Sequence, residues 1–249
     1  MGHIGDRILD KIALGAVSIK LPIAVAGQNE DRARFDGPIE LADAHFETTL
    51  QCAHHVNRQS LTDALLILGG APAHIVETGS SAWGTNSSLL FDSYVWSFGG
   101  SFDTVDIRVQ PLLELRRQVS PRSVLHCGDS VKYLESEAQG GQRGTAFDLA
   151  YLDSWDLDAS NPWPAALHGL KEFLAVSKMA KGGSVVLIDD TPNGVEHYPD
   201  AVRETALAFH KRWGMWPGKG MLVVEYMKSS PFLERLWHGY QVAFRFKAT

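Results

Sequence analysis

The feature that most constrains the fold is a regular alternation of strand-like and helix-like segments after residue 70. Short apolar runs predict strands at 74–76, 102–107, 123–126, 147–152, 184–188, 221–227 and 242–246. Longer segments with helical spacing predict helices at 87–96, 111–119, 130–138, 165–179 and 199–213. This alternation predicts a doubly wound α/β fold with a mostly parallel sheet of seven strands. No long helix joins the last two strands, which predicts a C-terminal antiparallel hairpin.

The first 70 residues have a different character. Residues 39–68 have helical spacing of apolar side chains and end at Gly69-Gly70, whereas residues 28–34 are polar and predict a loop or lid. We therefore expect residues 1–70 to form a helical or lid segment, packed on a ligand-binding core of residues 71–249. A chain of 249 residues is long enough for one such domain.

Charge and hydropathy exclude some kinds of partner. The formal net charge of −6 argues against a protein that coats nucleic acid, because no basic excess is present to neutralise phosphates. Charged residues interrupt the apolar stretch at 8–27, and no run reaches the roughly 18 uncharged apolar residues that a membrane span needs. Cys52 and Cys127 form no Cys-x-x-Cys pair, which favours a reducing compartment. We expect a cytoplasmic protein without nucleic-acid or membrane partners.

Polar and acidic residues follow the first five predicted strands. They are Glu77, Gly79 and Ser80, then Asp106, then Asp129 and Ser130, then Asp153, and finally Asp189 and Asp190. In open α/β sheets the ligand lies beyond the carboxyl ends of the strands. Each residue alone also fits an ordinary turn or helix cap, but their joint position predicts one ligand site. The Gly-x-Gly-x-x-Gly pattern of nicotinamide sites is absent after the first strand.

On these residues, the segment from Ile75 to Phe246 resembles the class I methyltransferases, which bind S-adenosylmethionine (SAM) on a Rossmann-like sheet. The resemblance implies that Glu77, Gly79 and Gly84 wrap the methionine part of SAM, that Asp106 holds the ribose, and that Asp129 and Ser130 lie against adenine. It also implies a closing hairpin from Gly218-Lys219-Gly220 onward. Four residues separate Gly79 from Gly84, where the family usually has three, so Ser80, Ser81 and Trp83 are alternative contacts.

Asp153, Asp189 and Asp190 resemble the divalent-metal ligands of metal-dependent O-methyltransferases of the catechol and macrolide-sugar types. The resemblance implies a bound Mg²⁺ that helps a substrate hydroxyl to lose its proton, because carboxylate oxygens suit this ion. The alternative is that Asp189 and Asp190 cap the following turn while Asp153 orients SAM or the substrate. The expected substrate is a small hydroxylated molecule or sugar, and a homodimer is left open.

The sequence offers more than one candidate for the general base. Metal-dependent relatives often have a Lys or His shortly after the acid of the fourth strand, and this chain has neither there. Asp156 and His197 are the candidates that we prefer, and His168 is a third. Two other functions stay open: a methyltransferase of the same fold that needs no metal, and a non-catalytic subunit that binds SAM.

Overall fold

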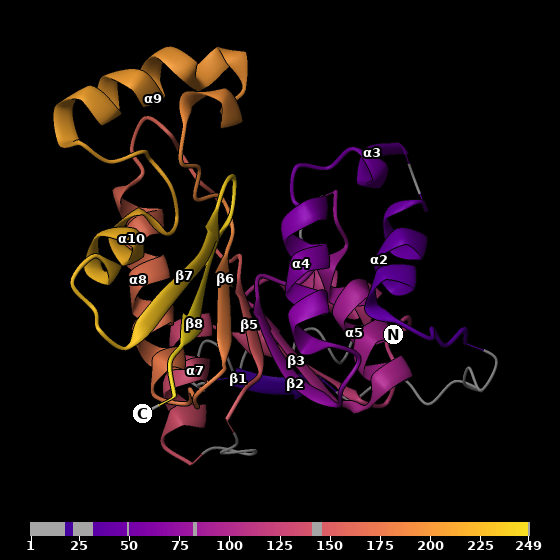
Figure 1. Cartoon of the computed structure of the whole chain (residues 1–249). Coiled ribbons are helices and arrows are strands. Elements are labelled where there is room, and N and C mark those ends of the chain that lie inside the picture. Colours follow the sequence, from indigo (N-terminus) through magenta and orange to yellow (C-terminus); the bar gives the residue numbers. More distant parts are fainter. Residues whose placement is uncertain (1–17, 22–31, 49, 82–83, 141–145, 249) are drawn as a thin grey trace.

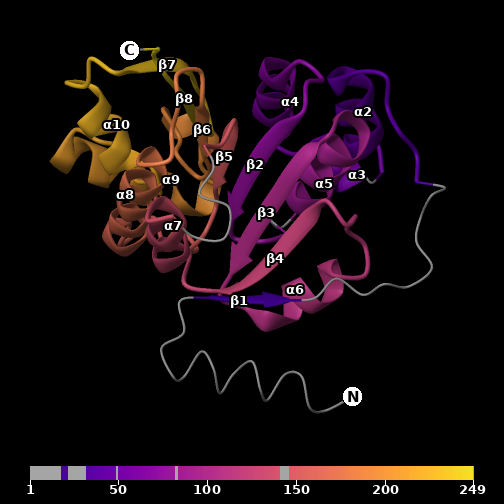
Figure 2. The same cartoon turned by 90° about the horizontal axis from the view of Figure 1, so that it is seen from below.

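One sheet of eight strands runs through the described chain, which in this computed structural model comprises residues 18–21, 32–48, 50–81, 84–140 and 146–248. The strand order is β1-β4-β3-β2-β5-β6-β8-β7 (Figure 1, Figure 2). Five consecutive neighbours are parallel: β4 (Ser123–Gly128), β3 (Gly100–Asp106), β2 (Ala73–Thr78), β5 (Leu149–Leu152) and β6 (Val185–Ile188). Their carboxyl ends therefore meet at one end of the sheet, as the alternation predicts.

A seven-stranded mixed sheet is present, as predicted, and one short strand extends it to eight within the described residues. The additional strand is β1 (Ser18–Leu21), which pairs antiparallel with β4. Without it, β4 would present an unpaired row of backbone groups at the edge of the sheet. β1 has only four residues and lies in a part of the chain without marked periodicity, so its pairing depends on the rest of the sheet.

The antiparallel hairpin is confirmed, but it begins later than predicted. It consists of β7 (Leu233–His238) and β8 (Val242–Phe246), and β8 pairs antiparallel with β6. The strand predicted at 221–227 is instead helix α10 (Met221–Met227), and Gly218-Lys219-Gly220 precedes this helix rather than opening the hairpin. A run of seven apolar-rich residues fits a buried strand or a short helix equally well. Contact with α8 (Trp163–Ser177) favours the helix.

Helices cover both faces of the sheet. α2 (Pro38–Phe46), α4 (Arg58–Leu68) and α5 (Ser87–Phe98) lie on one face, and α7 (Ser130–Ala138), α8 and α10 lie on the other (Figure 1). Adjacent residues of β2 belong to different hydrophobic cores. Ile75 packs in the core beneath α2, α4 and α5, and Val76 packs in the core beneath α7, α8 and α10. This is the arrangement expected when successive side chains of a doubly covered strand point to opposite faces. A smaller cluster packs α6 (Val109–Leu115) against β4.

The helical pattern at 39–68 is divided into three helices: α2, α3 (Leu50–Ala53) and α4. α2 contacts α4 and α5, so this segment packs on the first face of the sheet. Most of the loop predicted at 28–34 lies outside the described residues. The remaining elements are a short 3-10 helix η1 (Val195–His197) and helix α9 (Asp200–Trp213). Within the described ranges, no helix has the length and apolar character that crossing a membrane requires.

Candidate active site

A cavity of about 340 Å³ opens at the carboxyl end of the parallel strands. Six of the site residues predicted from the sequence line it: Gly79, Asp106, Asp129, Ser130, Asp153 and Asp156. They come from segments that follow β2, β3, β4 and β5, so the parallel topology brings together residues up to 77 positions apart, from Gly79 to Asp156. The exposed Trp155 and the half-buried His168 also line the cavity, with ring centroids 5.2 Å apart.

Gly79 brings the backbone after β2 into direct contact with the backbone after β5. It has a φ of +81°, and a Cβ there would lie 2.5 Å from the carbonyl oxygen of Asp153. Any larger residue would need the left-handed conformation that L-residues disfavour and would also collide with a main-chain atom. This explains why a glycine is needed at this wall of the cavity.

Glu77 lies beneath the loop after β2 rather than in the cavity lining. Its buried carboxylate accepts hydrogen bonds from Ser87 Oγ at 2.6 Å, Ser88 Oγ at 2.5 Å and Thr104 Oγ1 at 2.6 Å. Burial raises the pKa of Glu77 to about 7, although the three hydroxyl donors oppose the shift. Ser80 is also buried and bonds Thr104 at 2.7 Å. Both residues therefore hold the loop and the start of α5 in place.

Asp106 ends β3 and presents its carboxylate to the cavity, where Arg108 holds it. The Nε and Nη2 atoms of Arg108 lie 3.1 and 2.8 Å from the two carboxylate oxygens, and the backbone N–H of Arg108 donates at 2.7 Å. The Arg108 side chain is 60% exposed, whereas that of Asp106 is 3% exposed. A ligand hydroxyl group bound at Asp106 would thus compete with the exposed arginine side chain for the same carboxylate.

Asp129 and Ser130 begin helix α7 at the cavity wall. Asp129 is the N-cap, and its carboxylate accepts a hydrogen bond from the backbone N–H of Lys132 at 2.9 Å. Ser130 Oγ lies 3.0 Å from His168 Nε2. The helix-cap function that the sequence left open for Asp129 is therefore present in the fold, alongside its place in the cavity lining.

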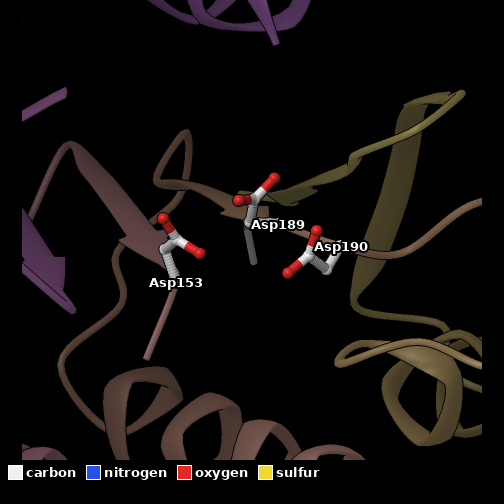
Figure 3. Close-up of side chains that lie close together, drawn as sticks. All are labelled: Asp153, Asp189 and Asp190. Carbon is white, nitrogen blue, oxygen red and sulfur yellow. The ribbon is translucent and has the colours of Figure 1, made fainter. Parts of the chain in front are cut away.

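Three carboxylates gather beyond the ends of β5 and β6. One oxygen each from Asp153, Asp189 and Asp190 lie within 4.8 Å of one another. Figure 3 shows these three side chains close together. Neighbouring residues of a strand normally point to opposite faces, but Asp190 has a left-handed φ of 41°, which breaks the strand conformation after Asp189. Asp153 also lines the cavity, so the acidic cluster adjoins it directly.

Neutral donors hold each member of this cluster. Asp189 Oδ1 accepts hydrogen bonds from Gln241 Nε2 at 2.6 Å and Asn57 Nδ2 at 3.0 Å. The Tyr240 hydroxyl donates to Asp190 Oδ1, and the Tyr151 hydroxyl lies 3.4 Å from Asp153 Oδ2. Asn57, Tyr240 and Gln241 belong to segments without a local motif, so no pattern in the sequence selects them.

Lys219 is the residue that sequence reasoning missed. Its Nζ lies 2.6 Å from Asp153 Oδ1 and 2.9 Å from Asp190 Oδ2, and its side chain is only 5% exposed. The Gly218-Lys219-Gly220 sequence is conspicuous, but we predicted that it begins the closing hairpin, and not that it belongs to the site. Burial opposes the charge on Lys219, and the three aspartates outweigh this effect and raise its pKa well above the ordinary value.

The pKa values of the three aspartates shift in different directions. Burial, followed by repulsion from Asp189, raises the pKa of Asp153 well above its usual range. Burial and Asp189 also raise the pKa of Asp190. Burial acts in the same direction on Asp189, but Lys219 and the hydrogen bonds to Asp153 and Gln241 lower its pKa overall. The cluster is thus a site of concentrated negative charge, centred on Asp189 and balanced by one ammonium group.

The candidate bases occupy different positions. Asp156 is exposed and lines the cavity, and His168 lines it nearby. Burial lowers the pKa of His168, but Glu172 raises it above the ordinary value overall, which disfavours this imidazole as a base. His197 lies on η1, where its ring centroid is 6.4 Å from that of Tyr240, the hydroxyl donor to Asp190. It is not among the residues that line the cavity.

The remaining predicted contacts belong to the loop after β2. The carbonyl oxygen of Gly84 accepts a hydrogen bond from Cys52 Sγ at 3.0 Å, and Gly84 does not line the cavity. The backbone N–H of Ser81 donates to Ser88 Oγ at 2.7 Å. Trp83 lies outside the described residues. The place of this loop in ligand binding stays a prediction.

No protein-family model and no curated protein matches the sequence. Solved structures do match. MycE methyltransferase from the mycinamycin biosynthetic pathway, in complex with Mg, SAH and mycinamycin VI, has a TM-score of 0.56 and 16% identity over 86% of this chain. The alignment spans only 54% of the MycE chain, about half its length.

Two further matches cover most of both chains. The O-methyltransferase from Bacillus cereus in complex with SAH has a TM-score of 0.51 and 17% identity, over 89% of this chain and 93% of that one. The SAH-bound Podospora anserina methyltransferase PaMTH1 has a TM-score of 0.50 and 16% identity, over 99% and 96%. At these identities the similarity establishes the architecture: this chain has the α/β fold of the class I methyltransferases.

Proposed function

We propose that this protein is a SAM-dependent methyltransferase that transfers a methyl group to a hydroxyl oxygen of a small molecule. The observation that carries the proposal is one cavity at the strand ends, which combines the close backbone turn at Gly79, the carboxylate of Asp106 and the start of α7. These are the kinds of group that suit an amino-acid tail, a ribose and an adenine, respectively. The shared fold with SAH-bound methyltransferases supports the same conclusion.

In this proposal Gly79, with Glu77, Ser80 and Gly84 supporting the loop, accommodates the methionine part of SAM. Asp106 accepts hydrogen bonds from the ribose hydroxyls, and Asp129 and Ser130 lie beside adenine. Trp155, which is 56% exposed at the cavity mouth, is suited to exclude water from the cofactor. The acceptor binds beyond Asp153, toward the acidic cluster.

Methyl transfer needs alignment more than new bonds to the protein. The acceptor oxygen attacks the methyl carbon of SAM as the carbon–sulfur bond breaks, and the products are the methyl ether and SAH. The hydroxyl proton leaves to a base, for which Asp156 is the best-placed candidate because it lines the cavity. His197 remains a second candidate.

The cluster has the donor chemistry of a magnesium site. Asp153, Asp189 and Asp190 supply hard carboxylate oxygens. The amide of Asn57 touches Asp189, and its Oδ1 is buried with no hydrogen-bond partner in the described structure. An unpartnered buried oxygen is costly, and it marks a polar group next to the cluster whose bonding is incomplete. A bound Mg²⁺ would favour the deprotonated form of an acceptor hydroxyl. The MycE complex with Mg supports this part of the proposal.

The test is calorimetric titration of the full chain with SAM and SAH, followed by a methyl-transfer assay against hydroxylated small molecules with and without Mg²⁺. We expect micromolar SAM binding, equivalent to about 8 kcal/mol, and formation of SAH that depends on the acceptor. Absence of SAM binding at millimolar concentrations would overturn the proposal. SAM binding without turnover on any acceptor would favour a non-catalytic binding subunit, and turnover that is insensitive to Mg²⁺ and chelator would favour a metal-independent enzyme.

The setting of this activity is proposed from the chain's general properties. Both cysteines are buried, and they form no Cys-x-x-Cys pair, which suits the expected cytoplasmic location. The acidic charge balance supports a small-molecule acceptor over nucleic acid. Size-exclusion chromatography with light scattering distinguishes a monomer from the homodimer that the sequence leaves open.

A further inference from the structure

The position of Lys219 within the acidic cluster has a consequence for cation binding. Its ammonium bonds one oxygen each of Asp153 and Asp190, from strand ends that are neighbours in the sheet. The other oxygens of these two aspartates have tyrosine hydroxyls as neighbours, from Tyr151 and Tyr240. The ammonium of Lys219 therefore occupies Asp153 Oδ1 and Asp190 Oδ2, the oxygens of these two aspartates that do not face a tyrosine hydroxyl.

The fold fixes this lysine in place from both sides. The backbone N–H of Lys219 donates to the carbonyl of Asp190 at 2.8 Å, and that of Gly220 donates to Thr191 Oγ1 at 2.9 Å. A Cβ on Gly218 would lie 2.7 Å from the Asp190 carbonyl oxygen, and one on Gly220 would lie 2.6 Å from Thr191 Oγ1. Only glycines allow this close approach, so the segment carries Lys219 rigidly alongside the Asp189-Asp190 turn.

The ammonium of Lys219 offsets part of the negative charge of the cluster. Three carboxylates face one ammonium, and groups of like charge this close strongly disfavour being ionised together. A divalent ion in the cluster would need carboxylate oxygens of Asp153 and Asp190, and two positive charges cannot share the same oxygens at close range without strong repulsion. Binding of the ion and the contact of the ammonium are thus mutually opposed.

We propose that Lys219 is a resident counter-cation that competes with the divalent ion for the Asp153–Asp189–Asp190 cluster. The ion enters only when the ammonium leaves Asp153 and Asp190, so the wild-type protein binds divalent cations weakly. A variant without the ammonium has a tighter site. This inference rests on the metal site of the proposed function, and it adds a residue that sets the affinity of that site.

The test measures Mn²⁺ binding by electron paramagnetic resonance and calorimetry, with the full chain at constant pH and ionic strength. The variants are Lys219→Met, which removes the charge and keeps the apolar stem, and Lys219→Arg, which keeps the charge. We expect Lys219→Met to bind Mn²⁺ at least about tenfold more tightly than wild type, or about 1.4 kcal/mol. Lys219→Arg should bind no more tightly than wild type.

Lys181→Met is the matched control. Lys181 pairs with Asp148 at 2.7 Å, at the opposite end of the same two strands, and its side chain is 52% exposed. Its loss should leave Mn²⁺ affinity unchanged, because a screened surface charge acts weakly on a distant site. Lys219→Gln replaces Lys219→Met if the latter does not fold.

Each outcome is decisive. Tighter Mn²⁺ binding and a larger rise of Tm with Mg²⁺ in Lys219→Met than in Lys181→Met support the proposal. Equal or weaker binding in Lys219→Met overturns it, and so does absence of binding in every variant. SAM titrations on the same samples separate this failure from failure of the methyltransferase proposal, because intact SAM binding leaves the latter standing.

Discussion

The ammonium of Lys219 lies 2.6 Å from Oδ1 of Asp153, and neither side chain is more than 8% exposed. A second lysine–aspartate pair, Lys181 with Asp148, has nearly the same length of 2.7 Å but is open to solvent. The two pairs lie at opposite ends of β5 and β6, and they differ in burial and in the second aspartate, Asp190, that Lys219 contacts.

We expect Lys219→Met to lower the free energy of unfolding by about 3 kcal/mol, because it leaves buried carboxylates without their counter-charge. Lys181→Met should cost less than about 1 kcal/mol, as solvent-exposed ion pairs do. Urea unfolding at pH 7, without divalent ions, measures both. Equal losses in the two variants would contradict the importance that we assign to the buried pair.

Gly79→Ala tests the close turn at the cavity wall. The added methyl group would lie 2.5 Å from the Asp153 carbonyl oxygen, so we expect a loss of stability and SAM binding that is at least about tenfold weaker, or about 1.4 kcal/mol. Gly214→Ala is the control, because Gly214 has a similar φ of +69° and no atom within 4 Å of an added Cβ. That variant should lose only the conformational cost, about 1–2 kcal/mol, and should bind SAM normally. A stability loss in Gly79→Ala no larger than in the control would show that the collision is relieved easily.

The raised pKa of Glu77 predicts a pH-dependent stability. Burial shifts this pKa from 4.5 to about 7, so between these values the folded protein keeps a proton that the unfolded chain releases. Rising pH in this window therefore favours unfolding. The stability of wild type should fall relative to Glu77→Gln by about 3 kcal/mol between pH 4.5 and 7, at 1.36 kcal/mol per pKa unit, and then level off. Chemical unfolding of both proteins across this range is the measurement, and parallel curves would mean that the pKa of Glu77 is the same in the folded and unfolded chains.

The Asp106–Arg108 pair predicts opposite effects of two substitutions on SAM affinity. Asp106→Ala removes the proposed ribose acceptor and should weaken SAM binding at least about tenfold, or about 1.4 kcal/mol. Arg108→Ala removes a competitor for the same carboxylate, so affinity should be unchanged or higher. Calorimetric titration gives both values. If Arg108→Ala weakens binding as much as Asp106→Ala does, the arginine contacts the cofactor itself.

Local patterns were sufficient for much of the fold. Helix α7 spans the predicted residues 130–138 because Asp129 caps its first turn, and β8 spans the predicted 242–246. The parallel order follows from the alternation of strands and helices. Because parallel strands end at the same edge of the sheet, the acidic residues that follow them lie close together. By contrast, the run at 221–227 carries no period that separates a strand from a helix, and β1 is too short to be recognised without β4 beside it.

The sequence by itself determined the α/β class, the end of the sheet where the cavity opens, and the cavity residues that directly follow strands. These depend on hydrophobic periodicity and on caps, which act within a few residues. Only the tertiary structure decided which distant groups complete the acidic cluster: Lys219 lies 66 positions from Asp153, and Asn57 lies 132 positions from Asp189. Such contacts arise from the packing of a loop and a helix end over the sheet, and no local pattern encodes them, because their stabilisation exists only once the sheet has formed.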